Sequence, residues 1–148
     1  MAALRLSDRS RNKLFNTLQN VRIDKQFLNR TGKDSAIKLI KDNEGVPYEG
    51  RGHFNCWNTQ KLASGKDSQR LSISLTHFLP NGGAEMLSSP KERVYLCLSG
   101  SLLLKGQKAD EYYLEPGDMV YIKPGEERSV EVVGTEPATI LVFIVDVD

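Results

Sequence analysis

The stretch that decides the fold lies in the C-terminal half of the chain and reads Gly117-Asp118-Met119-Val120-Tyr121-Ile122-Lys123-Pro124-Gly125. A Gly-Asp turn, a short apolar strand and a Pro-Gly turn follow one another directly, which is typical of a strand held between two tight turns. The same pattern of short apolar runs separated by turn residues continues on both sides of this stretch. The strand candidates are Arg93–Leu98, Ser101–Lys105, Tyr112–Leu114, Ser129–Val133 and Thr139–Val145. About nine short strands at near-regular spacing predict an all-β sandwich or barrel.

Further strands are expected upstream, at 36–40, His53–Leu62 and Leu71–His77. The segment Pro80-Asn81-Gly82-Gly83 has the composition of a turn. The strand before it alternates cleanly, and its apolar side carries Leu71, Ile73, Leu75, His77 and Leu79. Because an apolar side normally packs on the core, we expect this side, including His77, to face the barrel interior.

The first 34 residues differ from the remainder. They are rich in arginine and lysine, and Leu14, Leu18 and Val21 recur at helical spacing. This pattern predicts an N-terminal, helical extension over residues 1–34 and a barrel domain over residues 35–148.

Charge and cysteine content narrow the class of protein. Twenty basic and nineteen acidic side chains give a net charge of +1, so nothing in the overall charge favours nucleic acid or an acidic membrane as a partner. Cys56 and Cys97 form no CxxC pair, and the first residues lack the apolar run of a signal peptide. We therefore expect a cytoplasmic protein with reduced cysteines.

Two blocks of the sequence resemble the two motifs of the cupin superfamily. The first runs from Gly82 to Gly100, and the second runs from Gly117 to Val132 with the Gly-Asp turn, the apolar strand and the Pro-Gly turn in matching positions. The resemblance covers about Leu71 to Val145. It implies a double-stranded β-helix, the small jelly-roll barrel of that superfamily.

The departures from the cupin motifs concern the metal ligands that the resemblance implies. The glutamate position of the first motif falls on Arg93, and its histidine positions fall within 87–90, where there is no histidine. The histidine position of the second motif falls on Arg128. Two obligate cations would repel a divalent metal. We therefore predict that the usual metal site is absent and that no cofactor is bound.

The two arginines suggest a different ligand. A guanidinium binds a carboxylate or phosphate through two parallel hydrogen bonds. The expected partner is therefore a small-molecule carboxylate or another organic anion. Arg93 and Arg128, with His53 and Glu85, are the candidate substrate-binding residues. The alternative is that each arginine forms an ion pair at the rim with a nearby acid, such as Glu92, Glu126 or Glu127.

Three functions remain open at this stage. In the first, His77 or Tyr95 moves a proton in an isomerase or lyase reaction on an organic acid, while the arginines stabilise the developing enolate. In the second, the cavity only binds or senses the acid. In the third, His53, His77 and Glu85 rebuild a non-standard metal site. Whether the protein is an enzyme is not decided by the sequence, and Cys97 is a further, weaker candidate as a nucleophile.

The last predicted strand bears on assembly. Thr139–Val145 is apolar on both parities, as expected for a strand that is covered on both faces. A twofold homodimer, the commonest symmetric assembly, follows as a prediction.

Overall fold

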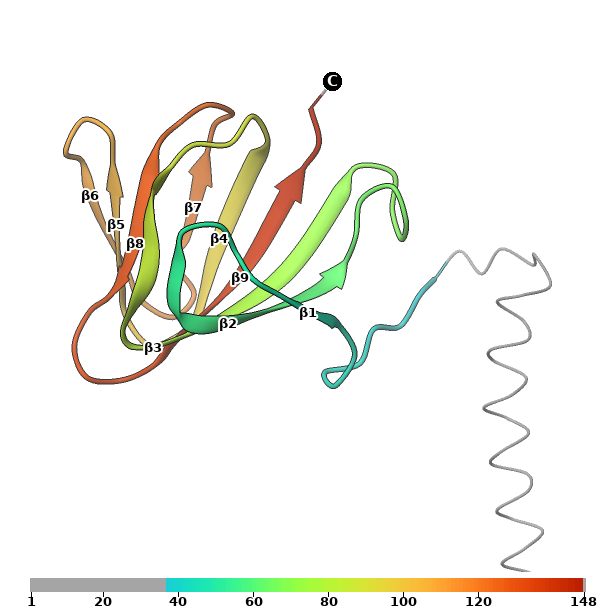
Figure 1. Ribbon diagram of the computed structural model, residues 1–148, viewed down its shortest axis with the longest axis horizontal. Helices are drawn as coiled ribbons and strands as arrows, with labels where there is room; N and C mark the ends of the chain where they lie inside the picture. Colours follow the sequence, from blue (N-terminus) through green and yellow to red (C-terminus); the bar gives the residue numbers. More distant parts are fainter. Residues whose placement is uncertain (1–36, 148) are drawn as a thin grey trace, which may run out of the picture. The chain divides into compact units, whose positions relative to one another are not determined.

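The computed structural model describes residues 37–147 (Figure 1). Within that range the chain forms nine strands and no helix, in a compact unit that begins at Ile40. The predicted helical extension over residues 1–34 lies outside the described residues. The strands are β1 Val46–Tyr48, β2 His53–Leu62, β3 Leu71–Leu87, β4 Glu92–Ser99, β5 Leu102–Gly106, β6 Glu111–Leu114, β7 Met119–Ile122, β8 Arg128–Val132 and β9 Ala138–Val145.

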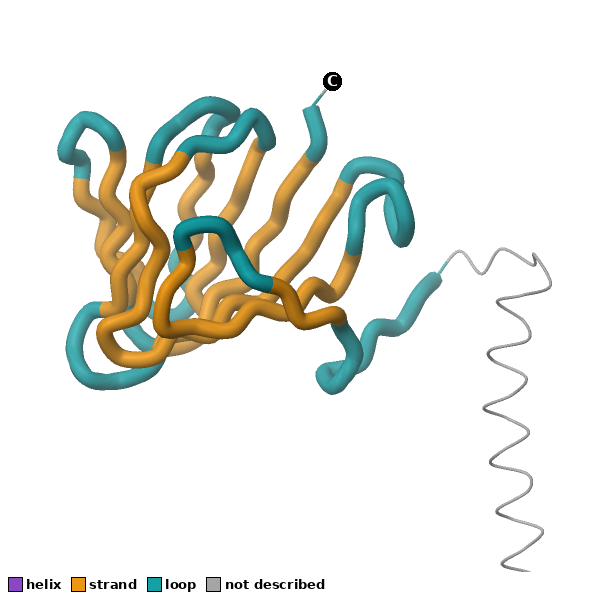
Figure 2. The backbone as a smooth tube through the Cα atoms, in the orientation of Figure 1, coloured by secondary structure: helices purple, strands orange, loops and turns teal. Residues whose placement is uncertain are grey.

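All strand pairings are antiparallel, and the strands curl into a nearly closed barrel (Figures 1 and 2). The order is β6-β5-β8-β3-β9-β4-β7, with β2 also pairing with β3 and β1 pairing with β2. β3 holds the barrel together, because its first half pairs with β9 and its last residues pair with β8. The all-β prediction is confirmed, and the arrangement is consistent with a jelly roll.

The middle of β3 contains the segment for which the composition predicts a turn. That prediction is wrong, since the strand continues through Pro80–Gly83 and bends there instead. Asn81 adopts a positive φ of 64°. A Cβ on Gly82 would lie 2.4 Å from the carbonyl oxygen of Asn55, and one on Gly83 would lie 2.2 Å from that of Val130. Glycine is therefore required here for close backbone approach rather than for reversing the chain.

The N-terminal edge of the barrel also differs from expectation. Residues 37–40 are not a strand, although the sequence predicts one there. A short strand forms instead at β1, within a segment whose Gly and Pro content predicts a loop, because Val46, Pro47 and Tyr48 pair with β2. Proline is tolerated in β1 because it is an edge strand.

The inward face of β3 is the reverse of the predicted one. Ser74, Thr76 and Phe78 are buried and face the interior, so Leu75 and His77 point outward. The core is completed by inward residues from the other strands, among them Tyr95, Cys97, Leu102, Leu104, Leu114, Ile122, Val130, Ala138, Ile140 and Val142. The prediction fails because the interior is partly polar while the outer face is apolar.

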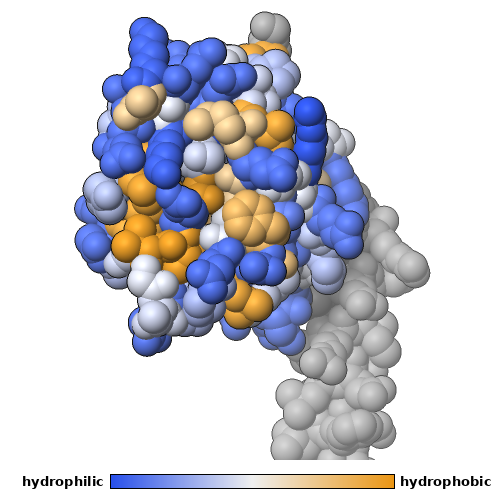
Figure 3. Space-filling view, turned by 60° about the vertical axis from the view of Figure 1, so that its left-hand side comes forward, coloured by the Kyte–Doolittle hydropathy of each residue, from blue (hydrophilic) through white to orange (hydrophobic). Residues whose placement is uncertain are grey.

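The surface of the barrel is mixed. In the view of Figure 3, hydrophilic side chains surround smaller groups of apolar ones. Between residues 37 and 147 there is no helix long and apolar enough to cross a membrane.

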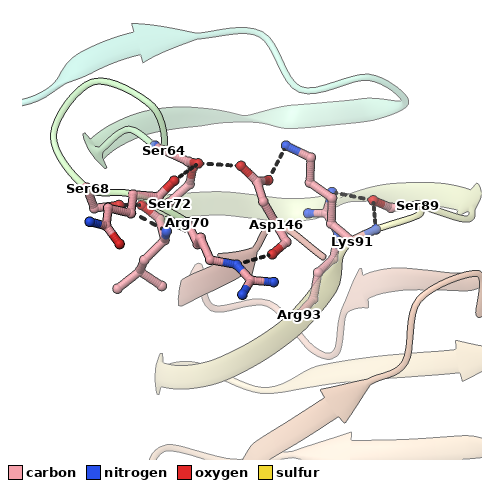
Figure 4. A network of polar contacts seen from close by, with 10 residues as sticks. Ser64, Ser68, Arg70, Ser72, Ser89, Lys91, Arg93 and Asp146 are labelled. Atoms are coloured by element: carbon pink, nitrogen blue, oxygen red, sulfur yellow. Dashed lines mark hydrogen bonds and ion pairs between the residues drawn. The ribbon is translucent and has the colours of Figure 1, made fainter. Parts of the chain in front are cut away.

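A polar network joins the end of β9 to two turns (Figure 4). Asp146 accepts a hydrogen bond from Ser64 and forms an ion pair with Lys91 at 2.6 Å, and its backbone carbonyl accepts from Arg70 Nε at 2.9 Å. The bonds from Lys91 and Ser64 lower the pKa of the Asp146 carboxyl. Since Lys91 lies in the loop before β4, this network positions the loop that borders the barrel opening.

Candidate functional site

A cavity of about 350 Å³ lies inside the barrel, within the usual range of ligand pockets, roughly 300–1,000 Å³. Its apolar wall comes from inward residues of β3, β8 and β9, including Phe78, Val130, Ile140 and Val142. Its polar lining consists of Tyr48, Arg51, His53, Thr76, Ser88, Ser89, Arg93, Tyr95 and Arg128.

Strand direction brings Arg93 and Arg128 to the same cavity. β4 and β8 both begin at the end of the barrel where β7 and β9 finish (Figure 1). Arg93 pairs with Ile144 near the end of β9, and Arg128 pairs with Leu87 at the end of β3. Both arginines therefore line one cavity, which they reach from different sides of the barrel.

Each guanidinium is partly satisfied by neutral groups. Arg128 donates from Nε to the Tyr95 hydroxyl at 3.1 Å and from a terminal nitrogen to the Leu87 carbonyl, and its Cζ lies 5.9 Å from the centroid of the Tyr95 ring. Arg93 donates to the Ser89 hydroxyl at 3.1 Å (Figure 4). The Nε of Arg93 is buried and has no hydrogen-bond partner among the described residues.

The cavity is strongly positive although the chain is nearly neutral. Arg51, Arg93 and Arg128 line it, and no aspartate or glutamate does. Within residues 37–147, neither Arg93 nor Arg128 forms an ion pair with a carboxylate, so the predicted alternative of rim pairs is not found there. Burial lowers the pKa of the Arg93 guanidinium; Tyr95 opposes this lowering, and the charge of Arg128 adds a smaller lowering.

His53 enters the cavity from the start of β2. Its Nδ1 lies 3.0 Å from Asn58 Oδ1, and its ring centroid lies 6.3 Å from that of Phe78. Burial lowers the pKa of His53; the bond to Asn58 opposes this, and the charges of Arg128 and Arg93 add to the lowering. The imidazole is therefore held in its neutral form near pH 7.

Two predicted site residues lie elsewhere. His77 is on the outer face of β3, where its ring stacks on Trp57 at 5.1 Å between centroids and its Nδ1 lies 2.9 Å from Thr139 Oγ1. The prediction that His77 faces the barrel interior is wrong. Glu85 is exposed and does not line the cavity; its backbone N–H donates to the Gly52 carbonyl at 2.9 Å.

The residues do not fit a metal ion. Residues 37–147 contain no group of three histidine, cysteine, aspartate or glutamate side chains that could hold one, so His53, His77 and Glu85 do not form the non-standard site. The cavity holds one imidazole, no carboxylate and three guanidiniums. That donor set does not suit the metal that the cupin motifs imply.

The cavity also contains residues that the sequence does not single out. Arg51 stands between Gly50 and Gly52 in the loop before β2, and a charged residue in a glycine-flanked loop is a weak signal of function. Tyr48 and Thr76 belong to the lining too, but only the fold brings them there. Cys97 does not line the cavity, and burial raises the pKa of its thiol.

A second, more open cavity of about 590 Å³ lies beside β1 and β2. Tyr48, Gly50 and His53 line both cavities. His53 therefore stands where the outer groove and the barrel interior meet.

Comparison with known proteins gives a family and a set of similar folds. Residues 74–144 match the family described as the cupin domain. The polyketide cyclase RemF from Streptomyces resistomycificus aligns with 17% identity over 74% of this chain and 79% of its own, with a TM-score of 0.65. A predicted oxalate decarboxylase from Thermotoga maritima aligns with 16% identity over 74% of this chain and 100% of its own, also at 0.65.

A cupin-like protein from Thermotoga maritima gives a TM-score of 0.63, with 13% identity over 75% of this chain and 83% of its own. No curated protein sequence matches the chain. At such identities the structural likeness establishes the fold, and the reaction has to be argued from the site. The family match and these neighbours agree with the two motif blocks, and the chain therefore contains a cupin domain.

Proposed function

We propose that the barrel binds a small organic acid through Arg93 and Arg128 and carries out proton chemistry of the isomerase or lyase type on it. The observation that supports this most directly is that both guanidiniums line one cavity in which no carboxylate offsets their charge. Buried like charges are costly unless an anion neutralises them. A carboxylate of the ligand supplies that anion.

The donors that remain free suit a carboxylate. The buried Nε of Arg93 has no hydrogen-bond partner among the described residues, and leaving a buried donor unpaired costs about 1–3 kcal/mol. A bound carboxylate oxygen relieves this cost at Arg93 and also accepts from Arg128. Arg51, which is exposed but lines the same cavity, adds a third positive charge and favours a ligand with two anionic groups.

The chemistry follows from the same charges. When a proton leaves the carbon next to a carboxylate, negative charge accumulates on the oxygens, and guanidiniums already in place stabilise it without reorganisation. The similar structures include a polyketide cyclase and a predicted oxalate decarboxylase, which shows that such barrels host different reactions and that the fold does not select one.

The test is the melting temperature of the dialysed full-length protein with malonate, succinate or inorganic phosphate. At a hundredfold excess over Kd a ligand stabilises by about 2.7 kcal/mol, which raises Tm by roughly 10 °C in a domain of this size. Arg128→Ala should abolish the rise, and Arg128→Lys should weaken it, because lysine lacks the bidentate fork.

The matched control is Lys108→Gln. It removes one positive charge from an exposed turn that does not line the cavity, so it should keep the full rise in Tm. If no anion stabilises the wild type, or if Lys108→Gln weakens the rise as much as Arg128→Ala, the cavity is not the anion site. Binding without turnover of any ligand would identify a binding or sensing module instead.

A further inference from the structure

The side chain of Asn58 determines which nitrogen of His53 carries a proton. Asn58 is 4% exposed, and its Nδ2 donates to the Tyr48 carbonyl at 3.3 Å. Its Oδ1 accepts from Thr76 Oγ1 at 2.8 Å and lies 3.0 Å from His53 Nδ1. An amide oxygen has no proton to give, so His53 Nδ1 must be the donor. In the neutral ring the lone pair is then on Nε2.

The position of the ring is also fixed. A Cβ on Gly50 would lie 2.4 Å from Nδ1 and 2.6 Å from Cε1 of His53, so the imidazole packs directly on the glycine backbone. Burial and the charges of Arg128 and Arg93 disfavour the imidazolium, and only the hydrogen bond to Asn58 opposes them. No acidic side chain lines the inner cavity, although Glu49 lines the outer one with His53. The balance lowers the pKa of His53, so the ring is a neutral base near pH 7 until an anion binds.

We propose that His53 is the proton acceptor of this cavity, and that its Nε2 takes a proton from the carbon next to the carboxylate of the bound acid. This rests on the proposed function. The C–H bond breaks and an Nε2–H bond forms, while the electron pair moves into the carboxylate to give an enolate held by Arg93 and Arg128. Return of the same proton from Nε2 to the γ-carbon of a β,γ-unsaturated acid gives a double-bond isomer, and departure of a leaving group with its bonding electron pair from the next carbon gives an elimination.

His53 thereby takes the role for which the sequence suggests His77. A general base must reach the ligand, and His77 stacks on Trp57 on the outer face. The acid that forms, a His53 imidazolium, is stabilised by the carboxylate that the arginines bring beside it. Proton transfer is therefore coupled to ligand binding.

The tautomer of His53 can be determined by NMR without any ligand. The protein has two histidines, His53 and His77, so long-range ¹⁵N–¹H spectra of the full-length chain show signals of two imidazole rings. The His77→Gln variant keeps only the signals of His53 and thereby assigns both sets. We expect His53 to be protonated at Nδ1 and unprotonated at Nε2 at pH 7. Asn58→Leu should mix the two tautomers at His53, whereas Thr139→Val should leave them unchanged. A neutral ring protonated at Nε2 would overturn the proposal.

The chemistry has a separate test. Solvent deuterium exchange into the protons on the carbon next to the carboxylate of malonate and succinate is followed by NMR, with calorimetry of the same acids alongside. His53→Gln should bind within about threefold of the wild type and lose at least 100-fold in exchange rate, while His77→Gln should keep both. Binding without exchange in the wild type would overturn the role of His53 and leave the anion cavity standing. Absence of binding in the wild type would overturn both.

A second inference concerns the outer face of the barrel. The strand registers align two rows of outward side chains across five strands. One row is Leu62, Ile73, Phe143, Val94 and Tyr121, and the other is Thr59, Leu75, Leu141, Leu96 and Met119. Leu71 and Val145 extend them. We call this set the outer patch. It is apolar apart from the hydroxyls of Thr59 and Tyr121, and its one charged neighbour in these rows is Glu92, which pairs with Val145 and bonds to Tyr121.

We propose that a second copy of the chain covers the outer patch and forms a twofold dimer. Two rows across five strands spaced about 4.8 Å apart, with same-face residues about 6.7 Å apart, and a third row over two strands give roughly 400 Å² in plane. Side-chain relief raises this area toward the roughly 600–800 Å² that each partner contributes to a small, stable interface. An apolar patch of this extent is comparable to the largest one on a typical monomer, roughly 300–600 Å², and such patches are often interaction sites.

The test is the mass of the full-length protein by sedimentation at 5–100 µM, where about twice 16.6 kDa is expected. Met119 is 62% exposed, so Met119→Glu should give a folded monomer, and Tyr113→Glu, at a residue 63% exposed but outside the patch, should remain a dimer. A monomeric wild type would overturn the proposal. If Met119→Glu then also increased hydrogen exchange in residues 14–21, the N-terminal segment would be the occupant.

Discussion

The Nε of Arg128 lies 3.1 Å from the hydroxyl oxygen of Tyr95, and the guanidinium carbon lies 5.9 Å from the centroid of the same ring. Tyr95 is 8% exposed, so this contact is inside the barrel. The phenol orients one guanidinium and leaves its remaining donors for a ligand. Because Arg93 reaches the cavity on the same strand as Tyr95, β4 sets the positions of both cations.

Tyr95→Phe removes the acceptor of Arg128 Nε and keeps the ring. Because a buried donor is left unpaired, we expect the free energy of unfolding of the unliganded protein to fall by about 1–3 kcal/mol. Carboxylate affinity should fall by about tenfold, since the guanidinium is no longer oriented. Chemical denaturation and calorimetry measure the two effects. Unchanged stability and affinity would show that the contact between Arg128 and Tyr95 is incidental.

The bend of β3 at Pro80–Gly83 gives a test of the fold. Gly83→Ala would place a Cβ 2.2 Å from the Val130 carbonyl oxygen, and overpacking of this kind costs about 1–3 kcal/mol or more. Gly106→Ala is the matched control, because its Cβ would lie 3.8 Å from Asp110 in ordinary contact. Chemical denaturation should give a much lower free energy of unfolding for Gly83→Ala than for Gly106→Ala. Equal stability of the two variants would contradict the bent course of β3.

The pH dependence of stability has a defined sign. The pKa of His53 is lowered in the folded protein, chiefly by burial, so between the folded value and the unfolded value of about 6.5 the unfolded state binds more protons. The free energy of unfolding should therefore fall as pH decreases below about 6.5, with a contribution of at most about 1.4 kcal/mol per pH unit. His53→Gln should remove this contribution. An identical pH profile in wild type and His53→Gln would contradict the neutral state of His53.

The two cysteines should react slowly. Burial raises the pKa of both Cys56 and Cys97, and the Cys97 thiol lies 3.5 Å from the Gly100 carbonyl. Since the thiolate is the reactive form, a disulfide reagent at pH 7.5 should modify the native protein far more slowly than the denatured protein. A thiol that reacts within seconds in the native state would restore the hypothesis of a cysteine nucleophile.

The sequence predicts the outline of the barrel because tight turns depend on local chemistry. β2 matches its predicted bounds, and β7 is the apolar strand expected between the Gly-Asp and Pro-Gly turns. β4, β5, β6, β8 and β9 differ from their predicted bounds by one residue at one end or at both. Alternation also places Arg93, Tyr95 and Cys97 on one side of β4, and the structure shows that this side is inward, with Tyr95 and Cys97 buried and Arg93 in the cavity lining.

The orientation of β3 could not be obtained in the same way. Its apolar parity faces outward because the inward parity, Ser74, Thr76 and Phe78, lines a polar interior. Alternation separates the two sides of a strand but does not say which one faces the interior when that interior is partly polar. His77 is misplaced for this reason. Arg51 is missed because its position depends on how the loop before β2 folds over the barrel.

The central claim is that Arg93 and Arg128 bind one anion together. The direct measurement is titration calorimetry of the dialysed, full-length protein with malonate, compared with the Arg93→Gln/Arg128→Gln double variant. The prediction is one site per chain in the wild type and at least about a hundredfold loss of affinity in the double variant, because two charged hydrogen-bonding groups contribute about 1.5–3 kcal/mol each. Equal affinity in the two proteins, or no binding by the wild type, would contradict the account.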